Sequence, residues 1–93
     1  MVENVIAEII AETKKDKDFF LNGGCLIFAN ILRGKVGGQL RWLVNENHAV
    51  VYHNKKLYDC TGNVTNKYKD SEYWDEETLM RHGKIVKGLK NKL

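Results

Sequence analysis

The chain has no proline and only two cysteines, Cys25 and Cys60. It also lacks a long apolar run: the longest, from Cys25 to Ala29, has five residues, whereas a bilayer-spanning helix needs about 20. The first turns carry Glu3 and Glu8 where a secretory signal would be basic and then wholly apolar. We therefore expect a cytoplasmic protein with no membrane partner, in which both thiols stay reduced.

A strong excess of one charge is also missing. The chain has 15 Lys and Arg against 12 Asp and Glu, a formal net charge of +3. The charges are segregated, because residues 70–77 are acidic and residues 81–92 are basic. The basic end is consistent with nucleic-acid binding, in which Arg41 and Trp42 would stack on bases. A solvated chain end is the other, and since no recognition motif accompanies the charges we expect no nucleic-acid partner.

The length of 93 residues predicts one domain, 1–93, because a second core would have nothing left to bury. Apolar residues make up 43% and charged residues 29%, which are ordinary values for a globular chain. The order of elements predicts an α+β fold in which two N-terminal helices pack on a small antiparallel sheet. We divide the chain into a helical half (1–34), antiparallel strands (39–62) and a mixed tail (63–93).

Two helices are predicted in the first part of the chain. Residues 2–13 place apolar side chains at the helical period, and residues 19–21 then return to the core. Asn22-Gly23-Gly24 signals a turn that contains a candidate helix cap. Residues 25–32 are apolar nearly all round, so they predict a buried central helix that ends near Gly34.

Strands are predicted from Gly37 onward. Three alternating or β-rich segments form antiparallel hairpins separated by the turns 45–47 and 54–56; these segments are 39–44, 48–53 and 57–61. Residues 63–74 show no clear period. Asp75-Glu76-Glu77 then predicts a short helix with an acidic start that ends at Gly83.

Cys25 is the first candidate for chemistry. It follows two glycines and begins a helix, where the helix dipole and unpaired N–H groups favour the thiolate. Gly23 and Gly24 would let a substrate backbone approach closely, so they are candidate binding residues. The alternative is a small core residue on an apolar helix.

His48 and Asp59 are the next candidates. His48 opens a strand of β-branched residues, and Asp59 lies inside the following strand, where aspartate is disfavoured. If a loop with an even number of residues joins the two strands, His48 and Asp59 share one face of the sheet. A carboxylate beside an imidazole orients the ring and fixes its tautomer. Read alone, each residue is also consistent with a solvated strand end or turn.

Taken together, Cys25, His48 and Asp59 follow the logic of a cysteine triad. The segments 23–29 and 48–51, with Tyr58-Asp59, resemble a minimal papain-like cysteine peptidase domain. That superfamily includes the NlpC-type cell-wall peptidases, and small phage proteins of unknown role share the pattern. The resemblance implies a papain-like core in which Cys25 is the nucleophile, His48 the base and Asp59 the orienting residue.

The resemblance also implies an activity. It would be hydrolysis or acyl transfer at an amide or peptide bond of a peptide or protein substrate, without a cofactor. Papain places an oxyanion-stabilising glutamine six residues before its nucleophile, and Phe19 occupies that position here. Asn22 is therefore the oxyanion candidate, and Trp42 is a further candidate binding residue.

Two other classes of function compete with a cysteine hydrolase. The residues Cys25, His48, His53, Asp59, Cys60 and His82 include zinc-binding types, but none has the short spacing of a structural metal site, so we expect no metal. The stronger rival is a non-catalytic protein-interaction module on the same scaffold. Such a module would bind a host protein, for example as a phage-encoded inhibitor of a host enzyme or defence system. Its contacts would come from Trp42, Tyr73, Trp74 and the acidic stretch 70–77.

Overall fold

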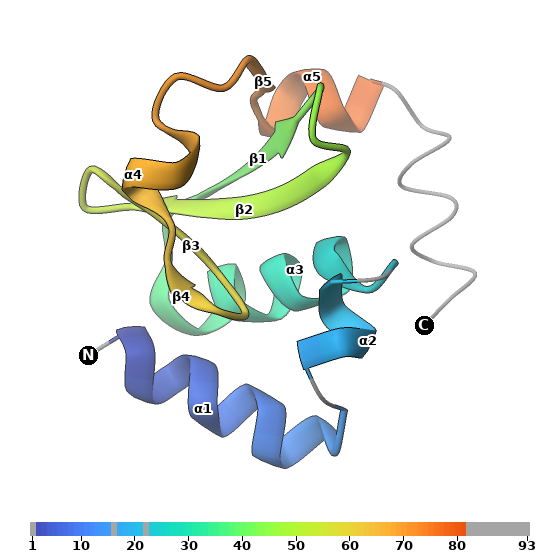
Figure 1. Cartoon of the computed structure of the whole chain (residues 1–93), viewed down its shortest axis with the longest axis vertical. Coiled ribbons are helices and arrows are strands. Elements are labelled where there is room, and N and C mark those ends of the chain that lie inside the picture. Colours follow the sequence, from blue (N-terminus) through green and yellow to red (C-terminus); the bar gives the residue numbers. More distant parts are fainter. Residues whose placement is uncertain (1, 16, 22, 82–93) are drawn as a thin grey trace.

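The computed structural model describes residues 2–15, 17–21 and 23–81 (Figure 1). The fold is α+β, as predicted. The chain runs α1 (Val2–Thr13), α2 (Lys17–Leu21), α3 (Cys25–Val36), β1 (Gln39–Leu43), β2 (His48–His53), β3 (Lys56–Asp59), β4 (Gly62–Asn63), α4 (Thr65–Tyr68), β5 (Tyr73–Trp74) and α5 (Glu76–Arg81). No helix among these residues has both the length and the apolar character needed to cross a bilayer.

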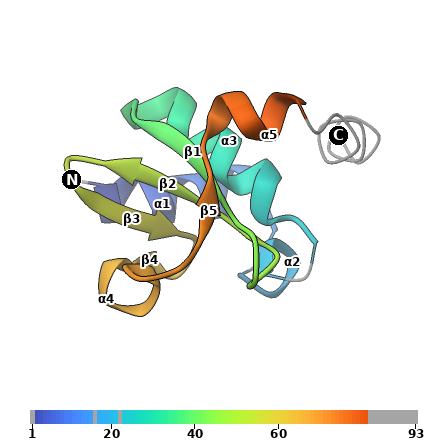
Figure 2. The same ribbon diagram turned by 90° about the horizontal axis from the view of Figure 1, so that it is seen from above.

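The five strands form one antiparallel sheet in the order β4-β3-β2-β1-β5. The central strands β1, β2 and β3 are the three that the sequence predicted. The two-residue strands β4 and β5 extend the sheet at its edges and lie in the part of the sequence without a clear period. Figures 1 and 2 show α3 running beneath the sheet, with α1 packed against α3.

Two apolar clusters cover the two faces of the sheet. The larger one joins the helices to the face that carries Ala49, Val51 and Tyr58. The smaller one lies on the opposite face and brings Val50 and Leu57 together with residues 64 and 68 around α4. Because successive side chains of a strand point to opposite faces, the even-numbered residues of β2 lie on the α4 side. His48 therefore belongs to that side.

Helix α3 is longer than the sequence predicted. It continues through Gly34 and ends at Val36, where Gly37 takes the positive φ of 85° and donates its N–H to the carbonyl of Arg33 at 2.8 Å. A positive φ just after the last turn turns the chain away from the helix axis, and glycine adopts it without a steric penalty. Both glycines fit the sequence signal, but only Gly37 has the terminating backbone conformation.

The segment before α3 also corrects the prediction. Residues 17–21 form the short helix α2. Only Phe20 enters the core, with 1% of its surface exposed, while Phe19 and Leu21 are 40% and 44% exposed. Helical geometry explains the difference, because neighbouring residues on a helix point about 100° apart. Gly24 holds the N-cap position of α3, and Asn22 lies outside the described residues.

The β2–β3 hairpin sets the geometry of the site. Its loop has two residues, Asn54 and Lys55, rather than the three that the sequence suggested, because Lys56 already pairs with His53. Both loop residues have positive φ, 49° and 65°, which is the backbone of a type I′ turn and matches the twist of the flanking strands. Strand β3 ends at Asp59, two residues before the predicted end, because Asp59 already pairs with Gly62 of β4.

Beyond β4, the described tail is helical at two places. Helix α4 spans only Thr65–Tyr68. Helix α5 begins as predicted after Asp75, whose Oδ1 accepts the N–H of Thr78 at 2.8 Å and caps the helix. The predicted end at Gly83, and the basic residues that follow it, lie outside the described residues.

Candidate active site

Cys25 is the first residue of α3, a helix of 12 residues that packs on β2. The residue before it must be glycine, because a Cβ on Gly24 would lie 2.8 Å from the ring of Phe19 and 2.9 Å from its carbonyl oxygen. The N–H of Gly24 donates to that same carbonyl at 3.1 Å. The turn thus places the half-buried Cys25 side chain at the positive end of the helix dipole.

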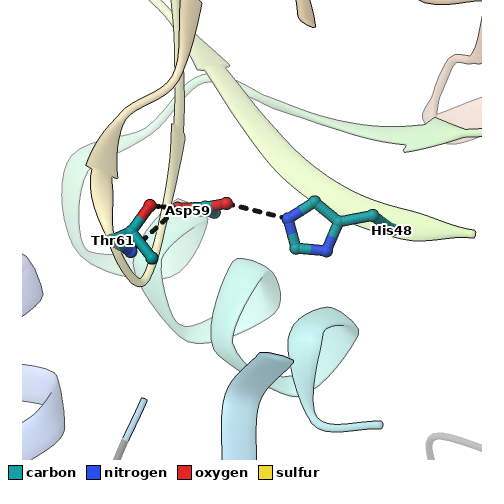
Figure 3. Close-up of polar contacts among 3 residues, drawn as sticks. All are labelled: His48, Asp59 and Thr61. Atoms are coloured by element: carbon teal, nitrogen blue, oxygen red, sulfur yellow. Dashed lines mark hydrogen bonds and ion pairs between the residues drawn. The ribbon is translucent and has the colours of Figure 1, made fainter. Parts of the chain in front are cut away.

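His48 and Asp59 form a buried hydrogen-bonded pair, drawn in Figure 3. The distance between His48 Nε2 and Asp59 Oδ2 is 2.8 Å, and the two residues are only 8% and 4% exposed. Because an ionised carboxylate can only accept hydrogen bonds, Nε2 carries a proton and donates a hydrogen bond to Asp59. The second ring nitrogen, Nδ1, therefore faces away from Asp59 and is left for Cys25.

The register of the hairpin explains why these two side chains meet. Val51 pairs with Tyr58, so one step along the ladder Asp59 lies opposite Val50, two residues from His48. His48 and Asp59 are thus diagonal neighbours on one face, as parity predicted for a loop of even length.

Thr61 holds the other oxygen of Asp59. Its backbone N–H donates to Asp59 Oδ1 at 2.8 Å and its hydroxyl donates to the same atom at 2.5 Å (Figure 3). Both carboxylate oxygens are therefore used, one by the imidazole and one by the turn after β3. A carboxylate that accepts several hydrogen bonds in a buried place is fixed in both orientation and charge.

The His48 imidazole is biased towards its charged form. Burial alone lowers the pKa of His48, but the hydrogen bonds to Asp59 and Cys25 and the charges of both partners outweigh burial and raise the pKa to about 9. The pKa of Asp59 moves the other way. Burial raises it, but the bonds from His48 and Thr61 hold it below its usual value.

The Cys25 thiol is biased towards the thiolate. Burial raises its pKa, but the hydrogen bond with His48, the N–H of Ala49 and the positive charge on His48 together lower the pKa below the ordinary value of 9.0. The backbone N–H of Leu26, in the first turn of α3, acts in the same direction. The shifts in the two pKa values both favour a thiolate–imidazolium pair beside the Asp59 carboxylate, which is the charge arrangement that activates cysteine nucleophiles.

Aromatic rings enclose this series. The ring of Tyr68, on α4, lies 5.6 Å from the imidazole of His48 between centroids. Phe20 and Phe28 line a narrow crevice together with Cys25, His48, Ala49, Asp59 and Cys60. The crevice has no room for a water molecule, so a ligand has to approach Cys25 from the outer surface rather than from inside the fold.

Sequence reasoning missed Thr61, Tyr68 and the Ala49 N–H. Thr61 had a usable signal, because an Asp side chain commonly accepts a hydrogen bond from the backbone N–H two residues later, in a turn. Tyr68 had none, since it lies in the segment without a clear period. The Ala49 N–H belongs to the backbone and carries no mark in the sequence.

The other predicted site residues lie at varied places. Gly23 is exposed and Gly24 is buried beneath Phe19. Asn22, the oxyanion candidate, lies outside the described residues. Trp42 is 9% exposed and belongs to the larger core cluster, because it pairs with Ala49 on the face that meets the helices. Its indole therefore packs in the core and offers little surface to a ligand.

The candidate metal ligands that the structure describes do not form one metal site. Within the described part of the chain, no three His, Cys, Asp or Glu side chains are placed to hold a metal ion together. His53 lies at the far end of β2, where its ring contacts the amide of Asn54 at 3.4 Å. Cys60 packs with the larger core cluster, and His82 lies outside the described residues.

Comparison with known proteins adds no relative: no family model, no curated protein and no solved structure matches this chain. The geometry of Cys25, His48 and Asp59 is therefore the basis for inferring a function.

Proposed function

We propose that this protein is a papain-like cysteine hydrolase or acyl transferase that acts on an amide or peptide bond. The observation that supports it most directly is the buried His48 held by Asp59, with its free nitrogen left for the thiol of Cys25. Burying an imidazole and a carboxylate together costs desolvation free energy, so such a pair indicates a role beyond stability. In a cysteine triad, the pair keeps the nucleophile ionised.

The proposed reaction has two stages. The Cys25 thiolate attacks the carbonyl carbon, and the electron pair of the C=O bond moves to the oxygen. When the tetrahedral intermediate collapses, the C–N bond breaks, His48 gives its Nδ1 proton to the departing amine, and a thioester remains on Cys25. His48 then removes a proton from water or an acceptor amine, which attacks the thioester and releases Cys25. Asp59 keeps its charge throughout and holds the ring.

Stabilisation of the oxyanion falls to backbone N–H groups in the first turn of α3, with Asn22 as the side-chain candidate. Phe19, at the position of papain's glutamine, carries no donor. A thiol nucleophile works only when reduced, so the proposal includes a reducing compartment such as the cytoplasm.

The first test measures alkylation of each cysteine by iodoacetamide as a function of pH, with mass spectrometry resolving the sites. Cys25 should react well below pH 8.5, the region of a free thiol, and His48→Ala should slow that reaction at pH 6.5 by about tenfold or more. Asp59→Asn should slow it too. Cys60, buried in the same protein, is the internal control. Labelling of Cys25 only near pH 8.5, unchanged in His48→Ala, would contradict the proposal.

A second test addresses acyl transfer itself. Incubation with p-nitrophenyl acetate should release p-nitrophenolate and leave an acetyl group on Cys25, visible as a mass increase that decays as the thioester hydrolyses. His48→Ala should slow both formation and decay, because His48 serves in each stage. An adduct that forms at the same rate in His48→Ala would mean a reactive thiol without a base.

The second candidate is a protein-interaction module. The observation in its favour is the set of large apolar side chains on the surface: Phe19, Leu21, Tyr73 and Met80. Exposed apolar side chains are common contact residues in interfaces. The two candidates separate on Cys25→Ser, because a module of this kind keeps its full biological effect in that variant while an enzyme loses it.

A further inference from the structure

Arg41 lies between two aromatic rings on the α4 side of the sheet, opposite α3. Its guanidinium carbon lies 3.8 Å from the ring centroid of Tyr52 and 4.0 Å from that of Tyr73. Tyr52 belongs to β2 and Tyr73 to β5, the strands on either side of β1, so the rings flank the guanidinium from two sides. We call these three residues the Arg41 clamp. Stacking fixes the plane of the guanidinium and leaves its N–H donors at the edge.

The chain has three arginines, and Arg41 differs from the other two. Arg33 lies 3.4 Å from a carboxylate oxygen of Glu76, and Arg81 lies 2.6 Å from one of Glu77. Within residues 2–15, 17–21 and 23–81, no carboxylate forms an ion pair with Arg41. Arg41 is half-buried, and a guanidinium that is oriented by two rings and has no acceptor among the described residues is prepared for an anion from outside the chain.

The Arg41 clamp lies on the same face of the sheet as His48 and Asp59, and Cys25 approaches His48 from the start of α3. Arg41 pairs with Val50, two residues from His48, which makes Arg41 and His48 diagonal neighbours with a separation of about 7–8 Å at the level of the sheet. Asp59 lies across Val50 on the other side. A molecule that reaches Cys25 beside His48 therefore extends over the surface next to the clamp.

We propose that the Arg41 clamp binds a carboxylate of the peptide or protein on which Cys25 acts. A planar, fixed guanidinium matches a carboxylate in a bidentate arrangement, and Arg is suited to this geometry where Lys is not. The statement that the carboxylate belongs to the substrate of Cys25 rests on the proposed function. The binding of a carboxylate at the clamp stands apart from it.

Binding is tested by nuclear magnetic resonance of the arginine Nε–H groups in the full chain. The probes are acetyl-Ala-Ala-Glu-amide, its Gln analogue, acetyl-Ala-Ala-Ala with a free C-terminal carboxylate, and inorganic phosphate. The Glu or free C-terminal peptide should shift the Arg41 signal in a saturable way, and the two peptides separate a side-chain source from a C-terminal one. Arg81 is the control for general charge effects, because it is exposed and already paired.

Variants of the clamp sharpen the test. Tyr73→Phe keeps the ring and should leave peptide binding unchanged, whereas Tyr73→Ala removes one side of the clamp and should weaken it. Arg41→Lys keeps the charge and should weaken binding by about fivefold or more, because the bidentate geometry is lost; loss of peptide-induced shifts at the neighbouring Tyr52 and Tyr73 amides reports this. Equal shifts with the Gln analogue, or shifts with phosphate alone, would overturn the carboxylate site.

The link to the substrate is read from Cys25. The acidic peptide that binds should protect Cys25 from iodoacetamide, the Gln analogue should protect less, and Arg41→Lys should abolish the difference. Binding without protection would overturn the link and leave the carboxylate site in place. A Cys25 that reacts as an ordinary thiol would instead overturn the proposed function, whatever the arginine signals show.

Discussion

At the scale of single residues, His48 is the residue on which the candidate site depends. One ring nitrogen of His48 contacts Asp59 and the other is left for Cys25, while the ring of Tyr68 packs near the imidazole. The sequence located this residue because a histidine among β-branched neighbours is unusual, and strand parity placed Asp59 on its face. It could not locate Thr61 or Tyr68, whose roles depend on how the chain turns after β3.

Thr61→Val should lower the reactivity of Cys25 while leaving the fold intact. The variant removes the hydroxyl that donates to Asp59 Oδ1 and keeps the backbone donor. The Asp59 carboxylate is then less firmly oriented and its charged form is less stabilised, so it stabilises the His48 imidazolium less. Alkylation of Cys25 at pH 6 should slow by about two- to tenfold, because only part of the roughly 1.5–3 kcal/mol of a hydrogen bond to a charged group reaches the thiolate through His48. Thr13→Val, a matched change on α1 far from the site, should leave the rate unchanged.

Stability should fall as pH rises through the pKa of His48. The folded pKa of about 9 lies above the ordinary 6.5, so the charged imidazole stabilises the fold fully below pH 6.5, and this contribution is lost by about pH 9. Each unit of raised pKa corresponds to about 1.4 kcal/mol. The Cys25 thiolate contributes with the opposite sign, so the measurement uses Cys25→Ser protein, in which Asp59 still raises the pKa of His48.

In that background, urea unfolding at pH 6.5 and 9 should show a loss in unfolding free energy on the order of 1 kcal/mol or more. The double variant Cys25→Ser with His48→Gln should show little change over the same interval. An equal loss in both proteins would mean that other groups cause it.

At the scale of elements, the site joins the start of one helix to one hairpin. Helix α1 and strand β2 match the predicted residues 2–13 and 48–53, because each carries a clear apolar period with no competing signal. The glycine that terminates α3 was predicted three residues early, since Gly34 and Gly37 look alike in the sequence and differ only in backbone conformation. Strands β4 and β5 are too short to show a period.

The turn before α3 yields a matched pair of glycine variants. Gly24→Ala places a methyl group against the ring and carbonyl of Phe19, so it should displace Cys25 and slow its alkylation at pH 6.5. Gly34→Ala, within the same helix, meets no atom within 4 Å and should stabilise the protein by about 0.5–1 kcal/mol, because alanine favours helix over glycine. Thermal unfolding and the alkylation rate together check both outcomes. Faster alkylation in Gly24→Ala would contradict this account of the turn.

At the scale of the whole molecule, Glu76 connects α5 to the rest of the fold. Its Oε1 accepts the backbone N–H of Leu40 at 2.7 Å and lies 3.4 Å from Nε of Arg33. One carboxylate therefore ties the last described helix to both β1 and α3. The sequence predicted a helix with an acidic start there, but it did not reveal a contact across 36 residues, because long-range partners leave no local pattern.

Glu76→Ala should lower the unfolding free energy by about 1–3 kcal/mol, because it leaves the Leu40 N–H without its acceptor and removes the ion pair with Arg33. Glu76→Gln keeps an acceptor for Leu40 and should cost less. Glu77→Gln, which removes an exposed pair with Arg81, should change the unfolding free energy by less than about 1 kcal/mol. Urea unfolding of the three variants checks the order, and a larger effect at Glu77 than at Glu76 would reverse the interpretation.

The two-residue loop between β2 and β3 has a consequence for altering this protein by insertion or evolution. Asn54 and Lys55 lie at the opposite end of β2 from His48, yet their number decides which face of the sheet Asp59 occupies. One inserted residue would either bulge out or transfer Asp59 to the wrong face, without any change at the site itself. The loop thus tolerates changes of residue type far better than changes of length, and a deletion or insertion scan there would separate catalysis from folding at a distance.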